Sequence, residues 1–491
     1  MRETNPDLPR PPVRAATPRH YHLIGIAGTA MASLAGLLRA AGHRVTGSDE
    51  NVYPPMSDQL RDLGIQYAVG YSPANLRPRP DIVVVGNAIS RGNVELEAVL
   101  NERLHYTSAA VTVKEELLRS RLPLAVAGTH GKTTTTSLLA AALEGAGLNP
   151  SFLIGGVAEN FGTSFRLTDS PYFVIESDEY DTAYFDKGPK MWHYLPYVAI
   201  VNNIEFDHAD IYRDEEAYRF AFARFINLVP GNGRLVAGWD SPIVRELAPK
   251  AFAPVESFGY GDPSAAEGGH PLWTAEGVEI GPEGTRFRAI KGGEAWGDVV
   301  TPLTGAFNVR NCLAVIVVAE AIGADRDGVR EGLRTFRSVK RRMEVRGEVR
   351  GVTVIDDFAH HPTAVRETID AVRQRYAGRT VVAVFEPRSY TAQRKEFQEP
   401  YRQAFAGADR VVLAGLFHPE RYTAETALNP NELVDAWRGE GKTADFIPDP
   451  DEIVRRLTPD LRGGEVVLIM SNGGFGGIHD KLLKALGGKE S

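Results

Sequence analysis

The sequence has little cysteine, no surplus of positive charge and no long apolar run, and each shortage excludes a class of protein. Its one cysteine, Cys312, cannot form a disulfide within the chain and fits a reducing compartment. Lysine and arginine number 55 against 63 acidic residues, so the net charge of −8 lacks the basic character of nucleic-acid binders. No run approaches the ~18–20 apolar residues that span a bilayer. We therefore expect a cytoplasmic protein with no nucleic-acid and no membrane partner.

The 491 residues are too many for one hydrophobic core, and at about 100–200 residues per domain several domains are expected. Residues 1–20 are rich in proline and arginine, lack the apolar core of a signal peptide, and are predicted to be a disordered tail. Beyond them, strand-like runs alternate with helix-like runs, which is typical of α/β domains with parallel sheets. We predict three such domains, at residues 21–122, 123–338 and 339–491.

Short apolar runs bounded by turn residues mark the expected strands. They are His22–Ile26, His43–Thr46, Asp81–Val85, Leu124–Ala127, Tyr172–Ile175, Val198–Val201, Val352–Ile355, Val381–Phe385, Val411–Ala414 and Val466–Met470. Residues 255–300 are rich in glycine, proline and glutamate and alternate over short stretches. This stretch predicts an antiparallel excursion within the central domain.

A glycine-rich loop lies between one expected strand and a helix. It reads Gly128, Thr129, His130, Gly131, Lys132, Thr133, Thr134. Glycines let backbone N–H groups close around phosphate oxygens, and the helix N-terminus adds the positive end of its dipole. Lys132 would reach the β- and γ-phosphates of a nucleotide, and the Thr133 hydroxyl would bind Mg²⁺. Val126 replaces the first glycine of the longer P-loop pattern, and the alternative is a plain strand-to-helix turn with a solvated lysine.

Acidic and amide residues follow two neighbouring strands of the same domain. Glu176 ends the run Tyr172–Ile175 and is followed by Asp178, Glu179 and Asp181; Val198–Val201 is followed by Asn202, Asn203, Glu205, Asp207 and His208. Strand ends of α/β sheets carry ligand-binding groups, and Mg²⁺ takes carboxylates together with substrate phosphates. A metal–phosphate site is predicted, although an isolated Asp-His pair is more often a surface or capping pair.

The third domain has its own polar cluster, in which Val352–Ile355 leads into Asp356, Asp357, His360 and His361. Neighbours in sequence rarely all face one metal ion, so contact with a ribose or phosphate is the favoured interpretation. The basic run Lys340–Arg342 is either a solvated face or the source of an arginine for the γ-phosphate.

The N-terminal segment Gly25–Ala30 is a degenerate relative of the dinucleotide motif G-x-G-x-x-G, and Asp49 follows Gly25 by 24 residues. The altered glycines, with a second nucleotide loop downstream, favour a nucleotide-like ligand other than NAD. The residues predicted to contact it are Gly25, Gly28, Thr29, Asp49 and Asn87.

From Tyr21 to about Leu486 the sequence resembles the Mur ligases, which build the peptide stem of bacterial cell-wall precursors. The matching residues, in order and spacing, are Gly128–Thr134, Glu176, Asn203–His208, Asn308, Asn311, Arg342 and Asp357. The resemblance implies a Rossmann-like N-terminal domain that binds a UDP substrate, a central P-loop ATPase domain and a Rossmann-like C-terminal domain. It also implies that ATP and Mg²⁺ are required.

Residue roles carry over from the resemblance. They assign Lys132 to the ATP phosphates, Glu176 and His208 to Mg²⁺, Asn308 and Asn311 to the region of the base, Arg342 to phosphate and Asp357 to ribose. Lys132, Glu176, His208 and Arg342 form the implied catalytic set. The sequence departs from the pattern of the Mur ligases at two places. No lysine that could be carbamylated occurs between Lys190 and Lys250, and Phe307 replaces the histidine common before Asn308.

Two branches of the family act on UDP-N-acetylmuramate, and one adds L-alanine whereas the other adds the recycled tripeptide L-alanyl-γ-D-glutamyl-meso-diaminopimelate. Tyr53–Ser57, Glu386–Ser389 and Met470–His479 resemble the recycling branch. We expect a ligase that activates the lactyl carboxylate as an acyl phosphate, with Arg388, Ser389 and Asn472 contacting the amine substrate. The alternatives are the alanine-adding ligase, a P-loop ATPase switch, and an NAD-dependent dehydrogenase.

Overall fold

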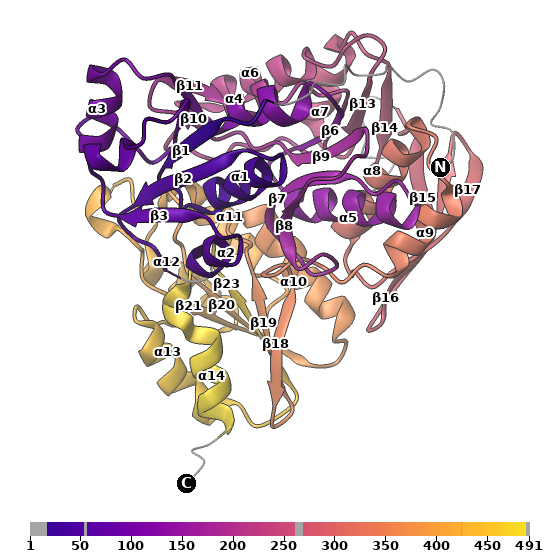
Figure 1. Cartoon of the computed structure of the whole chain (residues 1–491). Helices are drawn as coiled ribbons and strands as arrows, with labels where there is room; N and C mark the ends of the chain where they lie inside the picture. Colours follow the sequence, from indigo (N-terminus) through magenta and orange to yellow (C-terminus); the bar gives the residue numbers. More distant parts are fainter. Residues whose placement is uncertain (1–16, 54–55, 261–268, 424, 488–491) are drawn as a thin grey trace. The chain divides into compact units, whose positions relative to one another are not determined.

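The computed structural model describes residues 17–53, 56–260, 269–423 and 425–487 (Figure 1). The chain divides into two compact units, which are described separately. The first unit comprises Met1–Glu205, Glu216–Thr274 and Asn311–Leu333, and the second Phe206–Glu215, Ala275–Arg310 and Arg334–Ser491. Residues 1–16 of the predicted tail lie outside the described residues, and His20 already begins the first strand. Among the described helices, none is both long and apolar enough to cross a membrane.

The N-terminal part of the first unit is a five-stranded parallel sheet with the order β3-β2-β1-β4-β5. Its strands are β1 (His20–Ile24), β2 (Arg44–Asp49), β3 (Gln66–Val69), β4 (Ile82–Val85) and β5 (Tyr106–Ser108). Its helices are α1 (Thr29–Ala40), α2 (Met56–Asp62), α3 (Val94–Asn101) and α4 (Ala109–Val113). The strand order reverses between β1 and β4, and such a reversal opens a ligand crevice at the carboxyl ends of the strands.

A buried carboxylate ties this N-terminal sheet together. Glu95 of α3 is fully buried, and its Oε1 lies 2.7 Å from both His22 Nε2 and Ser48 Oγ. Its Oε2 accepts hydrogen bonds from Asn75 Nδ2 at 2.7 Å and from the Ser72 amide at 3.0 Å. Burial opposes the charge, but these hydrogen bonds outweigh it and lower the pKa of Glu95. The carboxylate therefore joins β1, β2 and α3 as a charged, fully bonded group.

The central sheet of the first unit runs β14-β13-β12-β6-β9-β7-β8, with only β7 and β8 antiparallel among these neighbours. Its strands are β6 (Leu122–Ala127), β7 (Ser151–Ala158), β8 (Thr163–Arg166), β9 (Tyr172–Glu176), β12 (Val198–Val201), β13 (Arg234–Gly238) and β14 (Val255–Phe258). A small antiparallel pair, β10 (Asp181–Ala183) and β11 (Asp186–Pro189), follows β9. The central strands β6 and β12 are buried along their whole length, as expected for a parallel sheet covered on both faces.

Helices α5 (Lys132–Gly145), α6 (Glu215–Ile226), α7 (Pro242–Leu247), α8 (Ala306–Ala321) and α9 (Arg326–Arg334) accompany this sheet. Glycine allows α5 and α9 to approach closely. A Cβ on Gly145 would lie 2.4 Å from the Gly328 carbonyl oxygen, and one on Gly332 would lie 2.4 Å from that of Ala141. These two helices therefore meet backbone to backbone, which a larger residue at either glycine would prevent.

Strand β15 (Trp273–Gly281) leads from the first unit into the second, where β16 (Gly284–Lys291) and β17 (Glu294–Thr301) pair antiparallel. The antiparallel pairing predicted for residues 255–300 is confirmed for β16 and β17, but β14 at the start of this range pairs parallel with β13 and β15, and residues 261–268 lie outside the described residues. The segment Ala275–Arg310 is grouped with the second unit rather than with the strands around the glycine loop.

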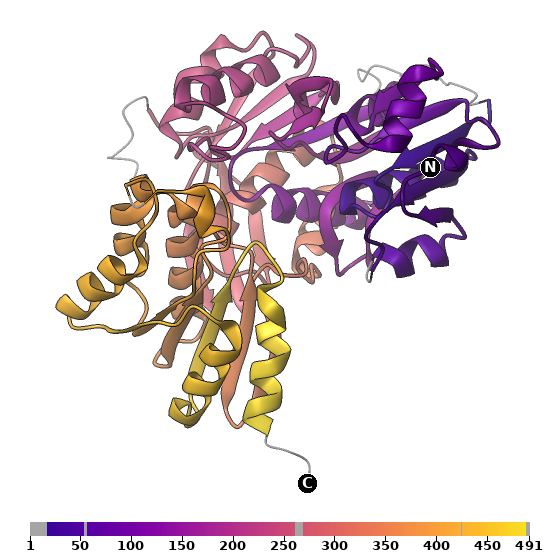
Figure 2. The same cartoon turned by 90° about the vertical axis from the view of Figure 1, so that its left-hand side faces the viewer.

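The remainder of the second unit is a six-stranded sheet with the order β18-β19-β23-β20-β21-β22, in which only β18 is antiparallel (Figure 2). Its strands are β18 (Glu344–Val349), β19 (Val352–Asp357), β20 (Thr380–Phe385), β21 (Arg410–Leu413), β22 (Thr443–Phe446) and β23 (Glu465–Met470). Helices α10 (Pro362–Arg375), α11 (Gln398–Ala404) and α12 (Pro430–Gly439) share one hydrophobic cluster with it. Helices α13 (Pro450–Leu457) and α14 (Ile478–Gly487) share the other.

The predicted α/β class with mostly parallel sheets is confirmed, and each expected strand is present within a few residues. The largest differences in strand ends occur in the N-terminal sheet. β1 ends at Ile24 rather than Ile26, because Gly25 turns the chain with φ +84°, and β2 extends to Asp49 rather than Thr46. Short strands such as β3, β5 and β22 were not predicted, since their mixed polar residues carry no apolar run.

Candidate functional site

The glycine loop has the predicted order of strand, loop and helix. β6 ends at Ala127, and Lys132 is the first residue of α5. Gly128 and Gly131 have φ angles of +138° and +81°, which residues with a side chain rarely adopt. A Cβ on Gly131 would also lie 2.9 Å from Asn311 Oδ1. Both glycines are therefore required by the shape of the loop, which is the shape that presents N–H groups to an anion.

Lys132 folds back over this loop. Its ammonium donates hydrogen bonds to the Gly128 carbonyl at 2.6 Å and the Thr129 carbonyl at 3.2 Å, and lies 2.8 Å from Glu179 Oε2. Glu179 is fully buried, and its Oε1 also accepts from the Tyr218 hydroxyl at 3.3 Å. In the sequence Glu179 belongs to an acidic cluster, and no local pattern there pairs it with Lys132.

Thr133 and Glu176, two of the predicted metal ligands, lie together. The Thr133 hydroxyl donates to Glu176 Oε1 at 2.8 Å, and Glu176 Oε2 accepts from the Gly155 amide at 2.7 Å. Glu176 is the last residue of β9, as predicted from the strand pattern. One hydroxyl and one carboxylate oxygen next to a phosphate loop form a donor set that suits a hard divalent cation.

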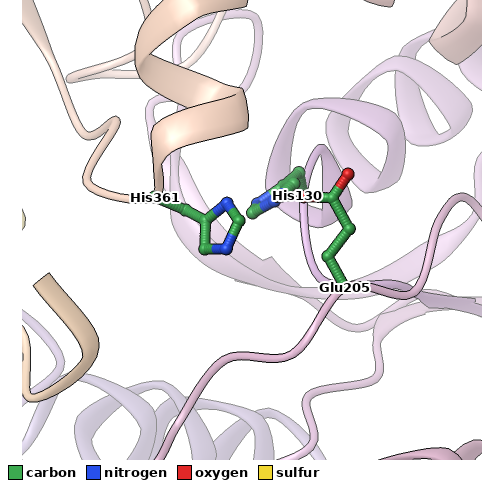
Figure 3. A group of neighbouring side chains, drawn as sticks. All are labelled: His130, Glu205 and His361. Carbon is green, nitrogen blue, oxygen red and sulfur yellow. Dashed lines mark hydrogen bonds and ion pairs between the residues drawn. The ribbon is translucent and has the colours of Figure 1, made fainter. Parts of the chain in front are cut away.

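Residues after β12 hold the loop in place. The Asn203 carbonyl accepts from the Thr129 amide at 3.0 Å, and its Oδ1 accepts from the His130 amide at 2.8 Å. His130 Nε2 lies 3.2 Å from Glu205 Oε2 (Figure 3). Asn202 donates to the Thr135 hydroxyl at 3.0 Å. Asn202, Asn203 and Glu205, which the sequence predicts near a metal–phosphate site, therefore hydrogen-bond to the phosphate loop and to the start of α5.

Helix α8 carries two further candidates. Asn311, in the first unit, is buried and accepts a hydrogen bond from the Thr135 hydroxyl at 3.0 Å. Asn308, grouped with the second unit, is also buried and donates to the Thr304 carbonyl at 2.8 Å. Phe307, half-buried, precedes it. Asn311 is thus brought to the phosphate-loop helix, whereas Asn308 bonds within its own turn.

In the second unit, the structure brings Asp207 to the histidines of the third-domain cluster. His360 Nε2 lies 3.5 Å from Asp207 Oδ2, and the His208 amide donates to Asp207 Oδ1 at 2.7 Å. Burial opposes the charge on Asp207, but His208, His360 and His361 outweigh it and hold the pKa of Asp207 well below its usual value. His208, the third predicted metal ligand, is held beside it with a φ of +56°.

Arg342 and Asp357 both lie in the second unit, Arg342 shortly before β18 and Asp357 at the end of β19. The Arg342 guanidinium lies 4.8 Å from the centroid of the Phe358 ring. Asp357 is buried, and its carboxylate accepts from the Met343 amide at 2.7 Å and the Ala359 amide at 2.8 Å. Burial raises the pKa of Asp357, with Arg342 acting in the opposite direction. Asp357 therefore organises the strand end in addition to any contact it makes with a ligand.

The residues predicted for the amine substrate also lie in the second unit. The Arg388 guanidinium stacks 3.4 Å from the Phe417 ring centroid, and its Nη1 lies 3.7 Å from Glu386 Oε1. Ser389 Oγ accepts from the Ala392 amide at 3.0 Å. The Asn472 Oδ1 atom is buried without a hydrogen-bond partner among the described residues. The contact with Glu386 shows that Arg388 also has an acidic partner within the protein.

The N-terminal candidates gather at the carboxyl edge of β1, β2 and β4. The Gly25 amide donates to the Ser48 carbonyl at 2.8 Å, and Gly28 caps α1, which begins at Thr29. Asp49 Oδ2 accepts from the Ala27 amide at 2.9 Å, so this acid supports the glycine turn. Asn87 is exposed just beyond β4. These residues surround the point where the strand order reverses.

A phosphate loop joined to a threonine–carboxylate pair, in a chain of α/β sheets, defines a nucleotide-binding enzyme of the P-loop class. The chain belongs to the Mur ligase family. Three family models match it, namely the Mur ligase family catalytic domain at residues 20–120, the Mur ligase middle domain at 126–319, and the Mur ligase glutamate ligase domain at 341–473. The resemblance inferred from the motifs is thereby confirmed.

Individual relatives match over nearly the full length. UDP-N-acetylmuramate–L-alanyl-γ-D-glutamyl-meso-2,6-diaminoheptandioate ligase of Haemophilus influenzae is 41% identical over 95% of this chain and 99% of its own. UDP-N-acetylmuramate–L-alanine ligase of an Anaeromyxobacter species is 34% identical over 96% and 98%. The crystal structure of a murein peptide ligase from Psychrobacter arcticus matches with a TM-score of 0.70 and 36% identity, covering 96% and 100%.

Proposed function

We propose that this protein is an ATP-dependent ligase that joins the lactyl carboxylate of UDP-N-acetylmuramate to the amine of L-alanyl-γ-D-glutamyl-meso-diaminopimelate in peptidoglycan recycling. The observation that carries the proposal is the full-length similarity to a relative named for this pair of substrates, which exceeds the similarity to the alanine-adding relative. The phosphate loop and its lysine supply the site for ATP. The reaction takes place in the cytoplasm, where ATP is available.

The chemistry requires the carboxylate to attack the γ-phosphate of ATP, giving an acyl phosphate and ADP. The free amine of the tripeptide then attacks the acyl carbon, loses a proton, and expels phosphate as the amide forms. Charge on the transferring phosphoryl group is balanced by Lys132 and Arg342, which is how phosphoryl transfer is mainly catalysed. When ATP is bound, Lys132 would exchange its hydrogen bonds to the Gly128 and Thr129 carbonyls for bonds to the ATP phosphates.

The donor set at the phosphate loop fits Mg²⁺. Thr133 and Glu176 already place a hydroxyl and a carboxylate oxygen 2.8 Å apart, and both are oxygen donors that this ion prefers. Thr133, Glu176 and His208 would hold the ion. When bound, Mg²⁺ neutralises charge on the nucleotide phosphates.

Further residues are assigned to the remaining parts of the substrates. Three domains, at residues 21–122, 123–338 and 339–491, each contribute residues to substrate binding. Gly25, Gly28, Thr29, Asp49 and Asn87 bind the UDP substrate at the N-terminal sheet. Gly128–Thr134, Asn308, Asn311, Arg342 and Asp357 bind ATP. Arg388, Ser389 and Asn472 contact the amine substrate. The Asn472 Oδ1 atom, which is buried with no hydrogen-bond partner in the described part of the chain, supports its part in this assignment.

Mass spectrometry of the products tests the proposal. The protein is incubated with ATP, Mg²⁺ and UDP-N-acetylmuramate, together with either L-alanine or the tripeptide, and reactions without ATP serve as controls. We expect UDP-N-acetylmuramoyl-tripeptide as the main product. Efficient addition of L-alanine alone would identify the alanine-adding ligase instead. ATP hydrolysis that ignores UDP-N-acetylmuramate would indicate a P-loop ATPase switch.

A further inference from the structure

The second unit contains a cavity of about 530 Å³. None of the residues that line it is among those assigned to substrates above. Seven of the eight residues that line it belong to two loops, namely Tyr390, Arg394, Lys395 and Glu396 after β20, and Tyr422, Glu425 and Thr426 after β21. Its volume lies within the range of about 300–1,000 Å³ that is usual for small-molecule sites.

Hydrogen bonds hold the two loops in a fixed relation. Gln393 is buried, donates to the Arg388 carbonyl at 2.9 Å, and accepts from the His418 amide at 3.1 Å. The Lys395 amide donates to the Thr426 carbonyl at 2.8 Å, and the Leu428 amide donates to the Gln393 carbonyl at 2.7 Å. The two loops that line the cavity are therefore joined by a short antiparallel pairing and by the hydrogen bonds of the buried Gln393.

The charges around the cavity are not all balanced within the protein. Arg394 and Glu396 form an ion pair with each other and so neutralise one another. The exposed Lys395 ammonium and Glu425 carboxylate have no ion-pair or hydrogen-bond partner among the described residues. Two tyrosines complete the lining, and the Tyr422 hydroxyl donates to the Tyr390 carbonyl at 3.0 Å. One available cation, one available anion and two aromatic rings suit a zwitterion carried on a short aliphatic chain.

We propose that this cavity selects the distal end of the diaminopimelate residue, with Lys395 pairing its carboxylate and Glu425 its ammonium. Diaminopimelate ends in a free α-amino acid, so it presents both charges on one carbon at the end of a methylene chain. Tyr390 and Tyr422 would cover those methylenes. This inference rests on the proposed function and adds the part of the tripeptide that distinguishes it from other amine substrates.

The test compares two tripeptides that differ only at the distal end. L-Alanyl-γ-D-glutamyl-L-lysine keeps the distal ammonium of the diaminopimelate peptide but lacks its carboxylate. Lys395→Met should raise the KM for the diaminopimelate tripeptide about tenfold, because one hydrogen bond to a charged group is lost. The KM for the lysine tripeptide should stay unchanged, because that peptide has no distal carboxylate. Glu425→Gln should raise both KM values. Lys484→Met, which removes an exposed cation of α14, is the matched control and should change neither.

The outcomes separate the two proposals. If the unaltered enzyme joins neither tripeptide to UDP-N-acetylmuramate, the proposed function itself is wrong. If it joins the diaminopimelate tripeptide but Lys395→Met shifts both KM values equally, or shifts neither, the assignment of the cavity alone is overturned. Unchanged KM values for ATP and UDP-N-acetylmuramate in both variants would exclude a general loss of structure.

Discussion

The Lys132 ammonium lies 2.8 Å from the carboxylate of Glu179, which is fully buried. This pairing gives the lysine of the phosphate loop a structural partner within the protein, in addition to its proposed contact with the ATP phosphates. Removing one member of a buried ion pair leaves an uncompensated charge, which usually costs about 3–5 kcal/mol. The catalytic and structural roles of Lys132 must therefore be separated by experiment.

Lys132→Ala should lower the ligation rate by roughly 10²–10³, because the variant loses a charge aimed at the transferring phosphoryl group. It should also lower the melting temperature, since Glu179 loses its cation. The double variant Lys132→Met with Glu179→Gln should recover much of the melting temperature but not the activity. Activity that returned together with stability would show that Lys132 acts only through the fold.

Glu176→Ala and His208→Ala should each raise the Mg²⁺ concentration needed for half-maximal activity, because each removes a proposed ligand. Glu176 also holds the Thr133 hydroxyl, so Thr133→Val should give a shift in the same direction. Asp178→Asn serves as the control, since Asp178 pairs with Lys190 at 3.2 Å. If the Mg²⁺ titrations of Glu176→Ala, His208→Ala and Thr133→Val all matched that of the Asp178→Asn control, the metal assignment would be contradicted.

Arg388→Ala should raise the KM for the tripeptide about tenfold or more, since a hydrogen bond to a charged group is worth about 1.5–3 kcal/mol. Arg388→Lys should recover little, because lysine lacks the planar fork that pairs with a carboxylate. The KM values for ATP and UDP-N-acetylmuramate should change much less. Weakening of all three substrates together would instead mean that the contacts with Phe417 and Glu386 make Arg388 structural.

Glu95 should make the stability of the N-terminal sheet depend on acid. Its pKa is lowered in the folded protein, so its stabilising contribution is present above the usual carboxyl value of 4.5 and is lost as the pH falls toward the folded value. Glu95→Gln should lower the free energy of unfolding at neutral pH by about 1–3 kcal/mol, since it disturbs buried hydrogen bonds. The difference from the unaltered protein should shrink below that pH, as measured by denaturant unfolding. A difference that stayed constant would show that Glu95 does not titrate on unfolding.

Local patterns in the sequence were sufficient for the glycine loop and for the acid that follows β9. The loop depends on contiguous residues, since Gly128 and Gly131 provide the backbone angles and Lys132 opens the helix. Glu176 follows a short apolar run that predicts a buried strand, and this run is β9. The α/β class followed from the same alternation of strands and helices, and the family resemblance followed from the order of these motifs.

Contacts between distant segments were decided by the tertiary structure alone. Glu179 contacts Lys132, which is 47 residues away in the sequence, and Asp207 contacts His360, which is more than a hundred residues away. Gln393 forms hydrogen bonds with two loops that follow different strands. Each contact depends on which strands are neighbours in a sheet, and strand order is set by how whole apolar faces pack rather than by the residues next to the contact. The sequence by itself therefore determined the local chemistry of the phosphate loop, while the packing of the sheets decided which side chains surround it.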